Sequence, residues 1–272
     1  MTTLKNHSLL YDTNCPLCSA YTKGFIKTGM LDENGRLSYE EGLNTYGTYV
    51  DADRSRHEIA LVDTTNGNVK YGIDSLVYII VTKFPFLKPL LHNRVLQFLL
   101  KKLYAFISYN RKVIAPSPNY LSQSCVPDFN LSYRILYILF SAAITSTVLL
   151  YYSDSLKTVI PLTNLWREYA ICFGQIAFQG GILLLMKTKK EFLFDYLGNM
   201  MTVSLLGGLL LMLLLIIRHF ISFAPIAYLA YFAGVVLFMF LQHRKRVAWI
   251  NAPAWLSYTW ILYRCLVLFI IL

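Results

Sequence analysis

The fold of the N-terminal part of the chain is decided by residues 9–18, which read LLYDTNCPLC. A short apolar run ends in a turn, and the turn ends in Cys-Pro-Leu-Cys at the start of a predicted helix. Pro16 suits the first turn of a helix because its φ is already helical and it has no N–H group. Unpaired N–H groups and the positive end of the helix dipole favour a thiolate on Cys15. Cys18 lies about one turn further on, so the stretch predicts a dithiol for redox chemistry.

Other interpretations of this stretch remain open. Cys15 and Cys18 are spaced like half of a zinc site, but a tetrahedral site needs two more ligands. The sequence has no second Cys-x-x-Cys, and His7 and His57 are not spaced as partners. Asp12 is placed either to take a proton from Cys18, the resolving thiol, or to cap the turn as an Asx residue. In a reducing cytoplasm the cysteine pair should rest as a dithiol.

The composition excludes a chain that is soluble throughout. Of the 272 residues, 56% are hydrophobic and 15% are charged, and the mean hydropathy is +0.47. The net charge of +10 comes from basic residues beside apolar spans, which fits an anionic membrane surface better than nucleic acid. Residues 1–8 have no apolar core, so no signal peptide is expected. Five cysteines, an odd number, do not form a secreted disulfide framework.

Residues 1–115 are predicted to form a small α/β domain. The expected strands are 7–12, 35–40, 57–63 and 68–71, and the expected helices are 16–27 and 73–84. Asn66-Gly67 lies between two β-rich runs and predicts a hairpin. The order β-α-β-(α)-β-β-α is that of a thioredoxin-like domain, with the Cys pair at the first strand-to-helix junction.

Residues 89–112 have the pattern of an amphipathic helix with a basic face. One interpretation is that this helix packs on the preceding domain and closes it. The other is that it lies on the membrane surface. Residues 116–132, which begin with Pro-Ser-Pro, are predicted to be a linker.

Residues 133–272 are predicted to form an all-α bundle of five transmembrane helices. Each apolar span is close to the roughly 20 residues that cross a bilayer as a helix. The turn at residues 218–221 is so tight that the third and fourth spans must form an antiparallel hairpin. The expected spans are 133–152, 167–186, 197–217, 220–241 and 254–272.

The basic residues between the spans predict the orientation. Three lysines lie in the second predicted connection, Lys187, Lys189 and Lys190, and the basic triplet at 244–246 lies in the fourth. The first and third connections hold only Lys157, Arg167 and Arg218. The positive-inside rule therefore predicts a cytoplasmic N-terminal domain and a C-terminus outside, in a bacterial-type inner membrane.

Polar groups within the predicted spans leave two interpretations open. Glu168, Gln175 and Gln179 share one face of the second span, and Asn199 and Arg264 lie in the third and fifth. Intramembrane ionisable groups are costly and face the interior, so a functional site is one interpretation. An interfacial position of Glu168 is the other. Five glycines are expected to permit close helix packing rather than chemistry: Gly174, Gly180, Gly181, Gly207 and Gly208.

Three cysteines lie outside the Cys-Pro-Leu-Cys motif. Cys125 is on the same side of the membrane as the motif and is interpreted as incidental or as a lipidation site more readily than as a redox relay. Cys172 and Cys265 lie at similar depth, on the order of 8–10 Å below the outer surface. They predict an intramembrane redox pair, against the alternative that both are small packing residues.

The stretch Tyr11-Asp12-x-x-Cys15-Pro16-Leu17-Cys18 resembles the Asp-x-x-Cys-x-x-Cys signature of the DCC family of thiol–disulfide oxidoreductases. Residues 72–76 (GIDSL) resemble its Gly-x-x-Ala-Leu segment, with Ser75 at the alanine. Residues 104–111 (YAFISYNR) resemble the Tyr-x-x-(Ile/Val)-Ala-x-x-Arg helix that closes the domain. The resemblance covers about residues 8–112. It implies a thioredoxin-like fold that includes the helix at 89–112.

The resemblance also implies protein-disulfide reductase activity at Asp12, Cys15 and Cys18. One departure concerns thioredoxins proper, which place a cis-proline before the third strand, facing the Cys pair. Residues 52–58 contain no proline, so substrate docking must differ.

The expected function is thiol–disulfide exchange, in which Cys15 attacks a substrate disulfide and Cys18 resolves the mixed disulfide. The expected partners are a protein or small-molecule disulfide, membrane lipid and subunits of a membrane complex. No cofactor besides the redox-active pair, no metal and no nucleic acid is expected. The alternative is a transporter or membrane-complex subunit in which the pair is a redox sensor or structural element. An exchange enzyme needs Cys15 exposed and Cys18 buried, which discriminates between the two.

Overall fold

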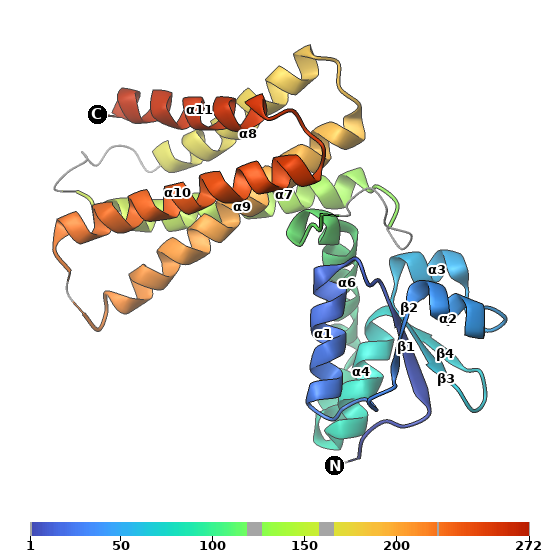
Figure 1. Cartoon of the computed structure of the whole chain (residues 1–272). Coiled ribbons are helices and arrows are strands. Elements are labelled where there is room, and N and C mark those ends of the chain that lie inside the picture. Colours follow the sequence, from blue (N-terminus) through green and yellow to red (C-terminus); the bar gives the residue numbers. More distant parts are fainter. Residues whose placement is uncertain (1, 119–126, 158–165, 222, 272) are drawn as a thin grey trace. The chain divides into compact units, whose positions relative to one another are not determined.

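The computed structural model describes residues 2–118, 127–157, 166–221 and 223–271 (Figure 1). The chain divides into two compact units, residues 1–130 and 131–272. Residues 119–126 of the predicted linker lie outside the described residues. The unit boundary itself falls at the end of that linker, immediately before the first long apolar helix.

The first unit contains a four-stranded mixed sheet. The strands follow the order β2-β1-β3-β4 across the sheet, with β2 parallel to β1 and with β3 and β4 each antiparallel to its neighbour. Parallel neighbours cannot be joined by a tight hairpin, so the connection from β1 to β2 passes through a helix. The strands are β1 (His7–Tyr11), β2 (Arg36–Ser38), β3 (Ala60–Asp63) and β4 (Val69–Tyr71).

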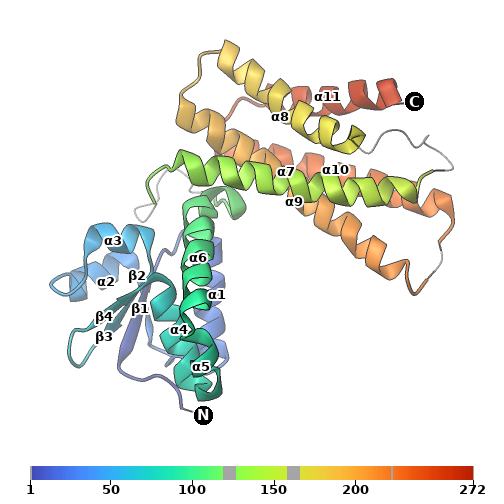
Figure 2. The ribbon, with the colours of Figure 1, turned by 180° about the vertical axis from the view of Figure 1, so that it is seen from behind.

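Helices cover both faces of this sheet: α1, α4 and α6 lie on one face, and α2 and α3 lie on the other (Figures 1 and 2). Successive residues of a strand point to opposite faces. Leu9 therefore packs with side chains of α1, α4 and α6, whereas Leu10 packs with side chains of α2. The helices are α1 (Pro16–Lys27), α2 (Tyr39–Tyr46), α3 (Ala52–His57), α4 (Gly72–Lys83), the short η1 (Pro85–Leu87) and α5 (Lys88–Leu91), and α6 (Arg94–Ile114).

The second strand is shorter than the predicted range 35–40 because a helix begins inside that range. The Ser38 hydroxyl accepts a hydrogen bond from the Glu41 N–H at 3.2 Å, and the Glu41 carboxylate accepts one from the Ser38 N–H at 3.2 Å. This capping box satisfies N–H groups at both ends of the first turn. It starts α2 at Tyr39 and ends the strand.

The third strand and the closing helix also begin later than predicted. Helix α3 ends at His57, so β3 starts at Ala60 rather than at residue 57. Asn93 caps α6, which starts at Arg94 rather than at residue 89. The predicted hairpin is confirmed, because β3 and β4 pair antiparallel on either side of Asn66-Gly67.

The second unit is all-helical. Four of its helices, α7 to α10, are long and apolar enough to cross a membrane, by length and composition, in the part of the chain that the structure describes. The fifth helix, α11, has 17 residues and is not among these four. Helix α9 packs against both α7 and α10. The helices are α7 (Leu131–Asp154), α8 (Arg167–Leu185), α9 (Lys190–Ile217), α10 (Pro225–Trp249) and α11 (Trp255–Ile271).

The basic triplet at 244–246 does not lie in a connection, as the sequence pattern predicted, but in the last turns of α10. Arg244 is exposed, whereas Arg246 is buried and donates a hydrogen bond to the Asn199 side-chain oxygen at 3.1 Å. The helix continues past the apolar span because basic side chains favour the negative end of the helix dipole. Arg246 is therefore a link between α10 and α9 and not a free surface charge.

The helices of the second unit are joined by buried polar contacts. The Tyr137 and Thr202 hydroxyls lie 2.7 Å apart, and His243 lies between the Tyr196 hydroxyl at 3.2 Å and the Ser257 hydroxyl at 3.0 Å. Such contacts hold helices together where apolar burial gives little preference for neighbouring helices over lipid.

Glycines allow close approach at some but not all of the predicted positions. A Cβ atom at Gly174 would collide with Tyr263, and one at Gly207 would collide with Met239. Gly181 has open space around it, so close packing does not explain that glycine.

Candidate functional site

The two cysteines of the Cys-Pro-Leu-Cys motif lie where the chain leaves β1 and enters α1. Asp12 forms the turn: its Oδ1 accepts a hydrogen bond from the Asn14 N–H at 2.9 Å, and its carbonyl accepts one from the Cys15 N–H at 3.2 Å. Cys15 is the N-cap of α1, with Pro16 in the first turn, and its sulfur accepts a hydrogen bond from the Cys18 N–H at 3.3 Å. The turn thus directs the Cys15 sulfur at the unpaired N–H groups of the helix.

The local electrostatics give the two thiols different protonation states. The pKa of Cys15 is lowered to about 7, chiefly because the Cys18 thiol donates a hydrogen bond to its sulfur, and further by the Cys18 N–H and the Arg111 guanidinium. The same hydrogen bond, together with burial, raises the pKa of Cys18 well above its ordinary value. Near neutral pH, a large fraction of Cys15 is therefore thiolate, whereas Cys18 remains a thiol and donates its hydrogen bond to the Cys15 sulfur.

Both cysteines are buried, each with 4% of its surface exposed. The burial of Cys18 is what a resolving thiol requires. The burial of Cys15 is not what an exchange enzyme requires, because a substrate disulfide must reach the attacking sulfur. In the arrangement described here, any such substrate must first displace part of the surroundings of Cys15.

Arg111 is the site residue that the sequence analysis did not single out for chemistry. It comes from the last turn of α6, and its guanidinium lies 3.8 Å from the Cys18 sulfur and 3.9 Å from Asp12 Oδ2. The only signal for it in the sequence is the final arginine of the segment 104–111, which was interpreted as part of a closing helix. Arg111 brings a positive charge to the pair from 93 residues away along the chain.

Asp12 has both of the features that the sequence left open. Its Oδ1 caps the turn, as an Asx residue does. Its Oδ2 is buried, accepts no hydrogen bond from the described residues and faces the Arg111 guanidinium. Burial raises the pKa of Asp12, and the Arg111 charge opposes that shift without cancelling it. A carboxylate with one free oxygen and a raised pKa is suited to accept a proton.

Three side chains of α6 bind the backbone just before β3, in the segment without proline. Arg111 donates a hydrogen bond to the Arg56 carbonyl at 3.2 Å, and Ser108 donates one to the His57 carbonyl at 2.6 Å. The Tyr104 hydroxyl accepts one from the Ile59 N–H at 2.9 Å. Helix α6 therefore packs on the α/β unit through specific polar contacts, in agreement with the first of its two predicted placements.

The described residues contain no group of three or more His, Cys, Asp or Glu side chains that could hold a metal ion. Of the other predicted positions, Cys125 lies outside the described residues. Cys172 and Cys265 are both free thiols, the first buried and the second exposed. The structure thus contains no disulfide between them and places them in different surroundings.

No family model, no curated protein and no solved structure matches this chain. The resemblance of residues 8–112 to the DCC family therefore rests on the motifs in the sequence.

Proposed function

We propose that the first unit is a thioredoxin-like thiol–disulfide oxidoreductase of the protein-disulfide reductase type, similar to the DCC family. The observation that carries the proposal is the pairing of a Cys15 sulfur with a pKa of about 7 and a buried Cys18 thiol at the start of α1. The strand order β2-β1-β3-β4, with helices on both faces and the pair directly after β1, supports a thioredoxin-like assignment.

In the proposed reaction the Cys15 thiolate attacks one sulfur of a substrate disulfide. The substrate S–S bond breaks, an S–S bond to Cys15 forms, and the second substrate sulfur leaves as a thiolate that takes a proton from solvent. Cys18 then loses its proton and attacks the Cys15 sulfur, which releases the first substrate sulfur. Two electrons pass to the substrate, and a Cys15–Cys18 disulfide remains until an external dithiol reduces it.

Asp12 and Arg111 have roles in the second of these steps. Asp12 Oδ2 accepts the proton that Cys18 gives up, because it is the buried carboxylate oxygen without a hydrogen bond beside the pair. Arg111, at 3.8 Å from the Cys18 sulfur, stabilises the thiolate that results. The two side chains thus lower the barrier to resolution of the mixed disulfide.

The second unit anchors this dithiol in a membrane of the bacterial inner-membrane type, with α11 as a fifth span. Seventeen residues of helix measure about 25 Å, close to the hydrocarbon thickness of about 30 Å. Arg134 at the start of α7 pairs with Asp195 near the start of α9 at 3.2 Å, which places both starts at one end of the bundle. Lys187, Lys189 and Lys190, which lie at or just before the start of α9, are exposed, and basic residues at that end support a cytoplasmic N-terminus.

One observation favours the alternative, a membrane-complex subunit or transporter in which the pair is a redox sensor. Cys15 is as deeply buried as Cys18, and a sensor needs only to reach small oxidants. The two functions differ in whether a disulfide partner becomes attached to Cys15.

The test is trapping with the full-length protein in membranes. Cys18→Ser keeps a hydrogen-bond donor beside Cys15 but prevents resolution, so an exchange enzyme accumulates a mixed disulfide at Cys15. The partner is released by reductant and identified by mass spectrometry. Cys265→Ser is the matched control and should accumulate none. If Cys18→Ser captures no partner while wild-type Cys15 and Cys18 still oxidise to a disulfide, the exchange function is wrong and the sensor function stands.

A further inference from the structure

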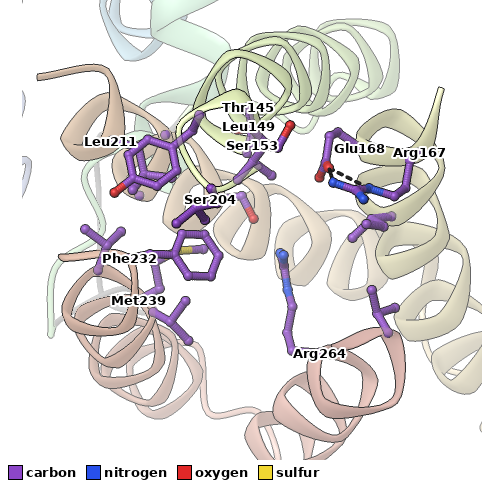
Figure 3. A pocket seen from close by; sticks show the side chains of 18 of the residues that line it. Thr145, Leu149, Ser153, Arg167, Glu168, Ser204, Leu211, Phe232, Met239 and Arg264 are labelled. Carbon is purple, nitrogen blue, oxygen red and sulfur yellow. Dashed lines mark hydrogen bonds and ion pairs between the residues drawn. The ribbon is translucent and has the colours of Figure 1, made fainter. Parts of the chain in front are cut away.

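The second unit contains a partly open cavity of about 260 Å³ among α7 to α11 (Figure 3). Most of its wall is aliphatic or aromatic, including Leu149, Phe232 and Met239. A cavity that binds one benzene measures ~150 Å³, and pockets for small molecules begin at ~300 Å³. This cavity therefore has room for one apolar chain or a small ring system, but not for both chains of a diacyl lipid.

The charges on the cavity wall do not cancel. Arg167 and Glu168 form an ion pair, with the Arg167 Nη2 donating to Glu168 Oε1 at 2.6 Å and its Nε donating at 2.9 Å. Arg264 is a second cation on the same wall. Two arginines and one glutamate give these three side chains a surplus of one positive charge.

Arg264 has no anionic partner among the residues that the structure describes. Its side chain extends from α11 into the cavity, whereas the Arg167–Glu168 pair comes from α8 (Figure 3). Its Nε atom is buried without a hydrogen bond, and its Cζ lies over the Trp260 ring, 5.3 Å from the ring centroid. A guanidinium in apolar surroundings is costly unless an anion or several acceptors complete its five donor positions.

We propose that this cavity binds an amphiphile with one apolar chain and one anionic oxygen head group, a carboxylate or a phosphate. The head group accepts hydrogen bonds from Arg264, which presents a planar fork of donors that matches both oxyanions. The chain occupies the apolar wall formed by α7, α9 and α10. Binding supplies the negative charge that the three wall residues lack.

The surroundings of the cavity give such a ligand a route of entry. Cys265 lines the cavity and is also exposed, so the cavity is accessible from outside the protein at this residue. For a chain that lies in a bilayer, a single-chain amphiphile enters such an opening laterally from the lipid. The proposal goes beyond thiol–disulfide exchange and does not depend on it, because no residue of the first unit takes part.

The test is photo-crosslinking of the full-length protein in nanodiscs of zwitterionic lipid with a diazirine-labelled hexadecanoic acid. Labelled peptides are mapped by mass spectrometry, and unlabelled hexadecanoic acid, hexadecyl phosphate and hexadecanol are added as competitors. We expect labelling of cavity-lining peptides, with the acid or the phosphate competing at least tenfold better than the alcohol. Whichever of the two anions competes better identifies the head group.

Variants separate the charge from the volume. Arg264→Gln should abolish the tenfold preference for the anion, whereas Arg264→Lys should retain part of it. Arg244→Gln makes the same change at an exposed arginine that does not line the cavity and should have no effect. Val236→Phe fills the cavity and should reduce labelling whichever competitor is present. The proposal is wrong if hexadecanol competes as well as the anions, if Arg264→Gln keeps the preference, or if the label maps to peptides outside the cavity.

Discussion

Removing the Cys18 thiol should raise the pKa of Cys15, because that thiol is the largest cause of its low value. The perturbation is Cys18→Ala, with Cys18→Ser as the matched variant that retains a side-chain donor. In the wild type the pKa of Cys15 is about 7, compared with an ordinary value of 9.0. The Cys18 N–H and Arg111, which lower the pKa of Cys15, remain in both variants, and so do burial and the Asp12 charge, which raise it. The pKa should therefore move back towards 9.0.

The size of the effect follows from the thiolate fraction and the reactivity of the thiolate. A pKa of about 7 leaves roughly half of Cys15 as thiolate at pH 7, and a pKa of about 9 leaves roughly 1%. A more basic thiolate is more nucleophilic, with a Brønsted coefficient of about 0.4–0.5, so a rise of two units in pKa increases the rate constant of the thiolate roughly eightfold. For a pKa of about 9, the net alkylation rate at pH 7 should therefore be about sixfold lower in Cys18→Ala.

The assay is iodoacetamide labelling of Cys15 as a function of pH, measured on the Cys15 peptide by mass spectrometry so that other cysteines do not contribute. The midpoint of the rate profile should lie near 7 in the wild type, move towards 9 in Cys18→Ala and move less in Cys18→Ser. Burial of Cys15 slows its labelling in all three proteins, so the midpoints of the rate profiles are compared and not the absolute rates. A midpoint that stays near 7 in Cys18→Ala would refute the assignment of Cys18 as the supporting donor.

Four further predictions concern the site, the core and the topology. Arg111→Met should lengthen the lifetime of the mixed disulfide more than it slows its formation, because the guanidinium stabilises the resolving thiolate; rapid-quench kinetics measure both steps. Burial raises the pKa of Asp12, so the wild type loses stability as the pH rises from the pKa of Asp12 in the unfolded state through its pKa in the folded state. Asp12→Asn should therefore melt at or above the wild-type temperature at about pH 7. The same variant should resolve the mixed disulfide more slowly. Leu61→Ala should lower the free energy of unfolding by about 2–5 kcal/mol because Leu61 is 1% exposed. Leu99→Ala should lower it by less than ~0.5 kcal/mol because Leu99 is 55% exposed. Urea titrations in micelles compare the two variants. A reporter that fluoresces only in the cytoplasm should give signal at the N-terminus and none at the C-terminus, and signal at both ends would mean an even number of spans.

Local sequence signals locate the elements of the first unit well and their ends less well. The α1 helix has the predicted bounds because Pro16 marks its first turn and Cys15 its cap. The predicted strand at 35–40 is cut short by the Ser38–Glu41 capping box, which lies in the sequence but competes with the strand pattern. Which of two overlapping local signals prevails depends on packing, here of α2 against the sheet face that carries Leu10.

Charge patterns predict an orientation for the second unit but not the contacts that each charge makes. The triplet at 244–246 has the composition of a connection, yet the helix runs through it and Arg246 is buried against Asn199. The polar side of Arg246 meets an acceptor 47 residues earlier in the chain, and no local window contains both. The number of basic residues near one end of a span is a local property, whereas the burial of one of them is not.

The same distinction between local and long-range contacts applies to the two proposed sites. The sequence reveals the residues that are brought together locally and does not reveal those that meet through tertiary packing. Cys15 and Cys18 are recognisable because a helix start brings residues three apart together without help from the rest of the fold. Arg111 reaches them only because α6 packs beside α1 on one face of the sheet, so its contribution to the Cys15 pKa depends on tertiary structure. Arg264 can be recognised in the sequence as a costly charge in an apolar helix, but its neighbours decide its meaning. Arg167 pairs with Glu168 at 2.6 Å, so one positive charge remains on the cavity wall, and this excess is the basis for proposing an anionic ligand.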